Sequence, residues 1–152
     1  MRHLRWLIVG FGLWLLGCNR QEATPPASPP IVPSTVESTP SLAALNRGAR
    51  LFQEHCALCH GPEAQGHPDW LTPGVVAAPP LNGTGNDWKR SREQLVAIIQ
   101  NGAKRNGVLI MPAWKDRLTD PEIADVIAWF QALWPPEVYV KWQRTHVTGT
   151  GS

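Results

Sequence analysis

Three stretches between residues 41 and 136 repeat their apolar positions with the 3.6-residue period of an α-helix. The small and apolar residues of each face are Leu45, Gly48, Ala49, Phe52 and Cys56 in residues 41–56; Leu95, Ile98 and Ile99 in residues 91–102; and Ile123, Val126, Ile127, Phe130 and Leu133 in residues 119–136. No stretch before residue 137 shows the sustained two-residue alternation of a strand. The pattern therefore predicts an all-α domain with about three main helices.

Residues at the ends of the second and third stretches agree with helix boundaries. Ser91 and Gln94 have the spacing of a capping box, and Gly102 can end that helix. Thr119 and Glu122 repeat the box, and two consecutive prolines stop the third helix. A domain of roughly 100 residues with three helices has a thin core, so we expect something besides side chains to supplement it.

The first 18 residues read as an export signal. Arg2 and Arg5 precede an apolar run from residue 6 to residue 17, which is too short to span a bilayer as an ordinary helix. The run ends in "LLGC", which resembles the lipobox of bacterial lipoproteins. The resemblance implies that residues 1–17 are a lipoprotein signal peptide and that Cys18 becomes the acylated N-terminus. The alternatives are an uncleaved anchor and a secreted soluble protein.

The next segment is a tether. Residues 18–40, which start at the acylated cysteine, are mostly Pro, Ser, Thr and small residues that cannot bury enough apolar surface to fold. We expect the globular domain in residues 41–135 and a C-terminal extension in residues 136–152. The chain has 14 Lys plus Arg and 12 Asp plus Glu, so removal of the two signal arginines leaves it neutral. Neutrality without a basic stripe argues against a nucleic-acid partner.

The candidate chemistry lies in "CALCH", residues 56–60. A structural zinc site normally needs four Cys or His ligands, and no second cysteine pair exists. A thioredoxin-like site needs a βαβ frame, and a simple disulfide would leave His60 unexplained. Two thiols three residues apart, followed directly by a histidine, are typical of covalent c-type haem attachment. We therefore expect one haem c, bonded to Cys56 and Cys59, with His60 as the proximal iron ligand.

The second axial ligand is predicted to be Met111. It is the only methionine besides Met1, and it lies in a Gly- and Pro-rich segment followed by Pro112. A thioether opposite an imidazole favours reduced iron and raises the reduction potential. Core filler is the alternative role for a lone methionine. The competing ligands are His67, which is close in sequence to His60, and His146 in the C-terminal extension.

With these residues placed, the chain resembles the class I cytochromes c over residues 42–134. Gly48 and Phe52 stand where that family packs its first helix against its last, and Trp129 takes the place of the aromatic partner on the last helix. In "APPLNG", the resemblance implies that Pro79 offers its carbonyl to the haem-bound histidine and that Leu81 packs on the ring. An ordinary turn is the alternative for this segment.

The chain departs from the minimal family pattern in two places. The loop of residues 61–78 is long, and the extension of residues 136–152 has no counterpart. Within the extension, Tyr139 and Trp142 have helical spacing and are expected to pack back on the domain. Seven cations lie between residues 88 and 117, and the hypothesis is that they steer an acidic redox partner.

The resemblance implies an all-α cytochrome c fold wrapped around one covalent haem, and an electron carrier rather than an enzyme. We expect it to cycle between Fe(II) and Fe(III) on the periplasmic side of a bacterial membrane, anchored through lipid on Cys18. Its expected donor and acceptor are membrane redox proteins, with a terminal oxidase and a quinol-oxidising complex as candidates. The alternatives are a haem-based ligand sensor or enzyme, and a cytochrome subunit of a larger oxidoreductase complex.

Overall fold

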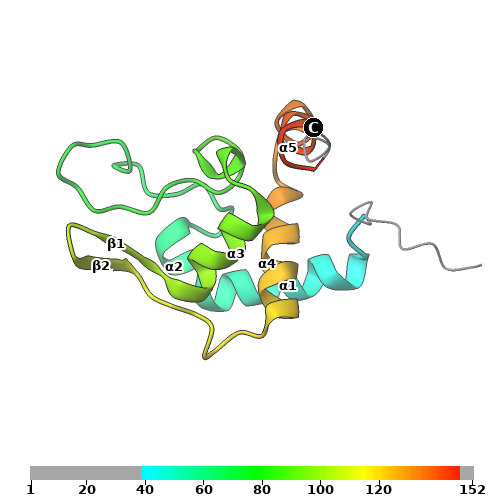
Figure 1. The fold of residues 1–152 in the computed structure, drawn as a ribbon, viewed down its shortest axis with the longest axis horizontal. Coiled ribbons are helices and arrows are strands. Elements are labelled where there is room, and N and C mark those ends of the chain that lie inside the picture. The colour runs from blue at the N-terminus through cyan, green and yellow to red at the C-terminus, as the bar shows by residue number, and fades with distance from the viewer. Residues whose placement is uncertain (1–38, 148–152) are drawn as a thin grey trace, which may run out of the picture. The chain divides into compact units, whose positions relative to one another are not determined.

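Residues 39–147, the part of the chain that the computed structural model describes, contain five α-helices, one 3-10 helix and two short strands (Figure 1). In chain order the elements are α1 (Leu42–His55), α2 (Ala57–His60), η1 (Asp87–Lys89), α3 (Arg92–Asn101), β1 (Ala103–Arg105), β2 (Val108–Met111), α4 (Asp120–Gln131) and α5 (Pro136–His146). The predicted all-α class is confirmed, and the three main predicted helices are α1, α3 and α4.

Both predicted capping boxes are present. Ser91 Oγ accepts a hydrogen bond from the backbone N–H of Gln94 at 3.3 Å, and the Gln94 side chain accepts one from the Ser91 N–H at 2.9 Å. The backbone N–H of Thr119 donates to Glu122 at 2.8 Å in the same way at the start of α4. These bonds satisfy N–H groups that the first helical turn leaves without partners, which fixes where α3 and α4 begin.

Helices α1 and α4 cross at a glycine. A Cβ atom on Gly48 would collide with the backbone of Asp125, so only glycine allows the two helices to approach this closely. One turn further along α1, the rings of Phe52 and Trp129 pack with their centroids 4.5 Å apart. An ion pair of 2.8 Å between Arg47 and Asp125 lies on the other side of the crossing. The crossing holds the end of α1, and therefore the CALCH segment, against the core.

A short hairpin interrupts the helical architecture. Strands β1 and β2 are antiparallel, with Ala103 paired to Met111 and an irregularity after Ala103. The turn is made by Asn106 and Gly107, whose φ angles of 51° and 80° are the left-handed values that a tight hairpin turn requires. The sequence pattern did not predict this hairpin, because strands of three and four residues are too short to show a sustained alternation.

Buried apolar side chains from α1, α3, α4 and α5, and from the segments between the helices, form one core. It consists of Leu51, Phe52, Ala64, Leu95, Ile99, Trp114, Leu118, Ile123, Val126, Ile127, Phe130, Trp134 and Trp142. The prediction that Leu133 continues the α4 stripe was wrong, since Leu133 is 40% exposed. Helix α4 ends at Gln131, so the helical phase is lost there and Trp134 turns inward instead.

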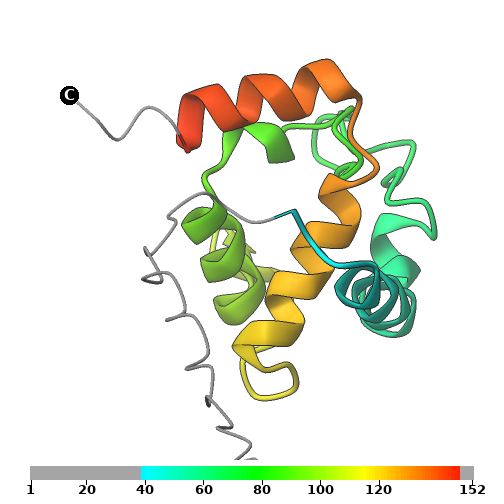
Figure 2. The ribbon, with the colours of Figure 1, turned by 90° about the vertical axis from the view of Figure 1, so that its right-hand side faces the viewer.

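Helix α5 lies across the domain beside η1 (Figure 2). The indole N–H of Trp142 donates to the carbonyl of Arg90 at 2.8 Å, and Trp142 is almost completely buried. The Lys141 ammonium lies 4.3 Å from the ring centroid of Trp88, on the 3-10 helix. The prediction that Tyr139 and Trp142 pack back on the domain is confirmed. No helix within residues 39–147 combines the length and apolar character needed to cross a membrane.

Candidate haem-binding site

The two cysteines of CALCH lie close together where α1 meets α2: Cys56 stands between the two helices and Cys59 lies within α2. Cys56 ends α1, and its carbonyl accepts hydrogen bonds from the N–H groups of Cys59 at 3.1 Å and His60 at 3.0 Å. Both thiols are free: Cys56 is half-buried and Cys59 is exposed. Burial, and secondarily the nearby Cys59, raises the pKa of Cys56 to about 11, so its thiol is protonated at neutral pH. The turn thus presents two neighbouring thiols that no disulfide engages.

His60 is buried and held in one orientation. Its Nδ1 lies 2.9 Å from the carbonyl oxygen of Pro79. Because a carbonyl can only accept, Nδ1 carries the proton and the lone pair of the neutral ring is on Nε2. Burial lowers the pKa of His60, which the bond to Pro79 partly counteracts, so the neutral ring is favoured at neutral pH. A neutral imidazole with its Nδ1 proton engaged is the form that binds a metal through Nε2.

The loop after His60 folds back to bring Pro79 next to it. Gly61, with φ of 76°, ends α2 in a conformation that favours glycine. The N–H of Gly66 then donates to the His60 carbonyl at 2.7 Å, and the N–H of Leu81 donates to the Ala64 carbonyl at 2.8 Å. These bonds tie both ends of the long loop together, so the Pro79 carbonyl reaches a histidine 19 residues earlier.

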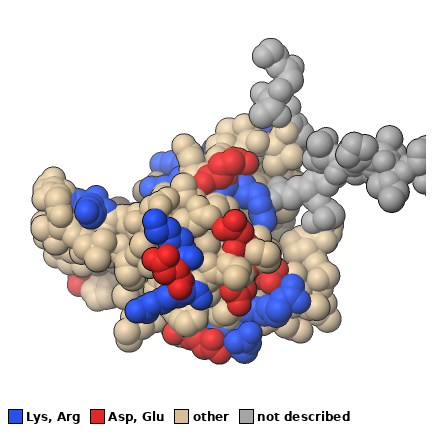
Figure 3. All heavy atoms as spheres, turned by 60° about the horizontal axis from the view of Figure 1, so that its bottom comes forward, with Lys and Arg blue, Asp and Glu red and all other residues tan. Residues whose placement is uncertain are grey.

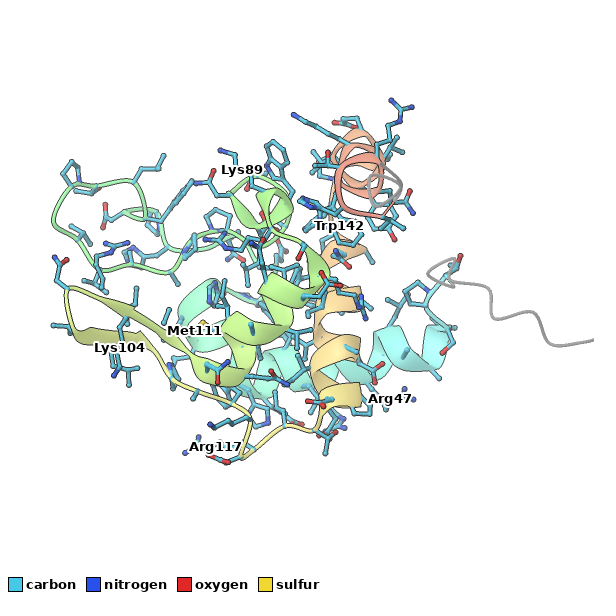
Figure 4. All side chains as sticks on the ribbon, in the orientation of Figure 1. Arg47, Lys89, Lys104, Met111, Arg117 and Trp142 are labelled. Atoms are coloured by element: carbon cyan, nitrogen blue, oxygen red, sulfur yellow. The ribbon has the colours of Figure 1, made fainter. Side chains whose placement is uncertain are left out.

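Met111 ends β2 and is anchored on both sides (Figure 4). It is half-buried and packs against the core, and its strand partner Ala103 follows directly after α3. Beyond Pro112, the N–H of Trp114 donates to the carbonyl of Ile99 at 3.0 Å, which fixes the chain to α3 again. Met111 therefore lies at the end of a strand rather than in the irregular loop that the sequence suggested.

The two competing histidines make other contacts. His67 is about half-exposed, and its Nδ1 accepts a hydrogen bond from the N–H of Asp69 at 3.1 Å. His146 lies on α5, where its ring packs 5.9 Å from that of Trp142. Within residues 39–147, no three His, Cys, Asp or Glu side chains converge to form a metal site of their own, which gives the zinc alternative no ligand set there.

The seven cations between residues 88 and 117 do not act as one group. Lys89 lies 5.6 Å from the ring of Trp88, and Arg90 donates to the carbonyl of Asn86 at 3.1 Å. On the face drawn in Figure 3, basic and acidic side chains alternate instead of gathering in patches of one sign. The steering hypothesis therefore rests mainly on Lys104 and Arg105 of the hairpin.

Sequence reasoning missed two residues near this site, Trp134 and Asp87. The indole N–H of Trp134 donates to the carbonyl of Leu81 at 2.9 Å. Asp87 is 2% exposed; its Oδ2 accepts a long bond of 3.4 Å from Gly83, and its Oδ1 has no partner among the described residues. The sequence contains only a weak signal for Trp134, because it follows a helix that seemed to continue. It contains no signal for Asp87, which is a single aspartate in a loop.

Asp87 should make stability depend on pH. Burial raises its pKa, and hydrogen bonds from backbone N–H groups and Trp134 counteract this only partly. An acid with a raised folded pKa stabilises the fold fully below its unfolded pKa of about 4, and that stability is lost as pH rises through the folded pKa. We expect Asp87→Asn to increase the free energy of unfolding at pH 8 by about 1.4 kcal/mol for each unit of raised pKa.

Urea unfolding of the haem-loaded protein at pH 4, near the unfolded pKa, and at pH 8 measures this effect. From the lower to the higher pH, the free energy of unfolding of the wild type should fall relative to that of Asp87→Asn. The exposed control Asp116→Asn should show the same pH dependence as the wild type. An equal pH dependence in Asp87→Asn and the wild type would show that Asp87 stays ionised in the folded protein.

Known proteins resemble the chain over this same region. Residues 43–130 match the family described as "Cytochrome C oxidase, cbb3-type, subunit III". The cbb3-type cytochrome c oxidase subunit CcoP of Azospirillum brasilense is 43% identical over 94 residues, which cover 60% of this chain and 29% of that protein. The subunit FixP of Sinorhizobium medicae (strain WSM419) is 34% identical over 89 residues, 59% of this chain and 27% of its own. The subunit FixPc of Rhizobium leguminosarum bv. viciae is 31% identical over 96 residues, which cover 63% of this chain and 29% of that protein.

The matches cover only part of each relative. The chain spans less than a third of the length of these relatives. No solved structure is significantly similar to it. The matched family and the helical architecture together confirm the predicted cytochrome c fold.

Proposed function

Because the chain belongs to the cbb3-type cytochrome c oxidase subunit III family, we propose that it carries electrons as a cytochrome component of a membrane oxidase complex. The sequence favoured a free carrier and kept a complex subunit as an alternative. The relatives are oxidase subunits by name, which supports the alternative better. Electron transfer itself is common to both readings.

The residues at the site fit a covalent haem c. Cys56 and Cys59 supply two free thiols on one turn, and His60 has its Nδ1 proton bound to the Pro79 carbonyl, so Nε2 is available to iron. This oriented imidazole is the observation that carries the proposal. Met111 would be the second axial ligand. When bound, haem c supplies the Fe(II)/Fe(III) couple that carries one electron.

We propose one haem, because the chain contains a single CxxCH motif. Leu81 would pack against the ring beside Pro79, at the point where the loop returns to α2. The protein's own groups bind, orient and shield the ring, and no acid or base is needed for transfer of an electron. The chain is therefore proposed to be a carrier without catalytic residues of its own.

Affinity purification tests the proposed assembly. A C-terminally tagged chain in its native host, extracted in mild detergent, should carry covalent haem by peroxidase staining and should co-purify with terminal oxidase activity. A Cys56→Ala and Cys59→Ala chain, purified in parallel, controls for carryover. The free-carrier alternative would be favoured if the haem-loaded chain eluted alone and exchanged electrons with the oxidase only by transient binding.

The membrane attachment is also proposed. Residues 1–17 would be the signal peptide, residues 18–40 the acylated cysteine and tether, residues 41–135 the cytochrome domain and residues 136–152 the extension. Cys18 and most of the tether lie outside the described residues. At about 3.1 Å per residue, an extended tether could hold the domain up to roughly 70 Å from the periplasmic membrane surface.

Replacing Cys18 tests this anchor. With a cleavable signal peptide, Cys18→Ser should move most of the protein from the membrane to the soluble periplasmic fraction, because the thiol that carries the lipid is gone. The visible spectrum should be unchanged, since the tether contributes no ligand. Membrane and soluble fractions stained for covalent haem measure the shift. Retention of Cys18→Ser in salt-washed membranes would show that something else attaches the chain.

A further inference from the structure

The tripeptide Pro79–Leu81 is held in place by three hydrogen bonds. Its two prolines have no N–H, so its only backbone donor is the Leu81 N–H, which binds the carbonyl of Ala64 at 2.8 Å. Side chains hold two of its carbonyls: the ring of His60 binds Pro79 at 2.9 Å, and the indole of Trp134 binds Leu81 at 2.9 Å. Trp134 is thus connected to His60 through two peptide units.

Trp134 is rigidly placed for this contact. It is 5% exposed, and a Cβ atom on Gly83 would lie only 3.2 Å from its ring, so the indole and the loop after Leu81 are in close contact. The ring meets that of Trp142 edge-on at 5.9 Å and that of Tyr139 at 6.3 Å. Both of these rings come from α5, so the extension closes the far side of Trp134.

Helix α5 is itself fastened to the loop that follows this tripeptide. Trp142 binds the carbonyl of Arg90, and Lys141 lies over the ring of Trp88. The loop from Leu81 to Arg90 is therefore held at one end by Trp134 and at the other by Trp142. Both tryptophans lie beyond residue 130, where the match to the family ends.

We propose that Trp134 is a positioning residue for His60, and that α5 clamps it there. The inference rests on the proposed role of His60 as the proximal iron ligand. A strong bond from Nδ1–H to a carbonyl makes the imidazole a better electron donor to a metal, which stabilises oxidised iron. Without the indole bond, Pro79–Leu81 can move away, the bond from His60 weakens, and the reduction potential rises.

The substitution that removes this hydrogen bond is Trp134→Phe, which also removes the interaction of the indole with Asp87. It removes the N–H and keeps an aromatic ring in the core. The matched control is Trp129→Phe, because Trp129 also packs on a core phenylalanine, but on Phe52 of α1 rather than beside the tripeptide or α5. Trp142→Phe loosens the clamp while leaving the Trp134 indole in place.

Two measurements on the full-length, haem-loaded protein read out the orientation of His60. Spectroelectrochemical titration gives the reduction potential, and NMR of the reduced form gives the exchange rate of the His60 Nδ1 proton with solvent. Trp134→Phe should raise the reduction potential. It should also speed the exchange of the His60 Nδ1 proton by about fivefold to tenfold, the effect of losing roughly one net hydrogen bond. Trp142→Phe should shift both in the same direction by less, and Trp129→Phe should leave both at wild-type values.

An unchanged potential and exchange rate in Trp134→Phe would overturn the inference. If Trp134→Phe does not fold, wild-type values in Trp142→Phe would overturn it equally, and a smaller shift in the expected direction would support it. Equal shifts of the potential and the exchange rate in Trp134→Phe and Trp129→Phe would show that Trp134 acts only through general packing of the core. A wild-type chain without covalent haem would refute the proposed function instead, so the two failures are distinguishable.

Discussion

Met111→Ala should open the iron to external ligands and lower the reduction potential by on the order of 100 mV or more. In the reduced variant, carbon monoxide should bind within the mixing time, whereas the wild type should bind it slowly or not at all. The reason is that alanine cannot reach the metal, and loss of a thioether removes the ligand that favours Fe(II). Stopped-flow mixing and redox titration measure the two effects.

Met111→His separates ligation from packing. It should keep six-coordination and resist carbon monoxide, yet have a lower potential than the wild type, because imidazole favours oxidised iron more than a thioether does. The controls His67→Ala and His146→Ala should change neither property. If Met111→Ala kept the wild-type potential and the iron–sulfur charge-transfer band, Met111 would be core filler. Rapid binding of carbon monoxide by the wild type would favour the ligand-sensor alternative.

The second large effect concerns folding without haem. Cys56→Ala combined with Cys59→Ala, expressed so that no haem is attached, should lose most of its helical circular dichroism signal at 222 nm. The structure leaves several large apolar side chains exposed on the long loop and the hairpin; they are Leu71, Val76, Val108 and Leu109. A small domain with this much uncovered apolar surface has little stability of its own.

The matched control is Leu58→Ala in the haem-loaded protein. Leu58 lies between the two cysteines and is 98% exposed, so its removal disturbs the same turn without preventing attachment. It should melt cooperatively near the wild-type temperature. A haem-free double variant that also melted cooperatively would show that the packing of α1 on α4 is a sufficient core.

The starts of α3 and α4 could be predicted, and the candidate CALCH motif could be recognised, because their signals are local. The capping boxes at Ser91 and Thr119 use side chains three residues apart, so the sequence alone contains both partners. CALCH is likewise complete within five residues. The contact between His60 and Pro79 spans 19 residues, and only the family resemblance suggested it.

The missed features depend on tertiary packing. Strands of three and four residues carry no usable periodicity, so the hairpin that ends at Met111 could not be recognised from the pattern of apolar positions. The apolar stripe of α4 seemed to continue to Leu133 because the sequence does not show that the helix ends at Gln131. Once it ends there, Trp134 can turn inward, and its hydrogen bond to Leu81 depends on a residue 53 positions away.

The hairpin turn also divides the chain at a vulnerable point. Lys104 and Arg105 are exposed and directly precede the Asn106–Gly107 turn, so within residues 39–147 trypsin should cut there first rather than within a helix. Cleavage would leave the CALCH segment on one fragment and Met111 on the other. If both supply iron ligands, the prosthetic group would join the two pieces in addition to the packing of α1 on α4, and the nicked molecule would remain one particle.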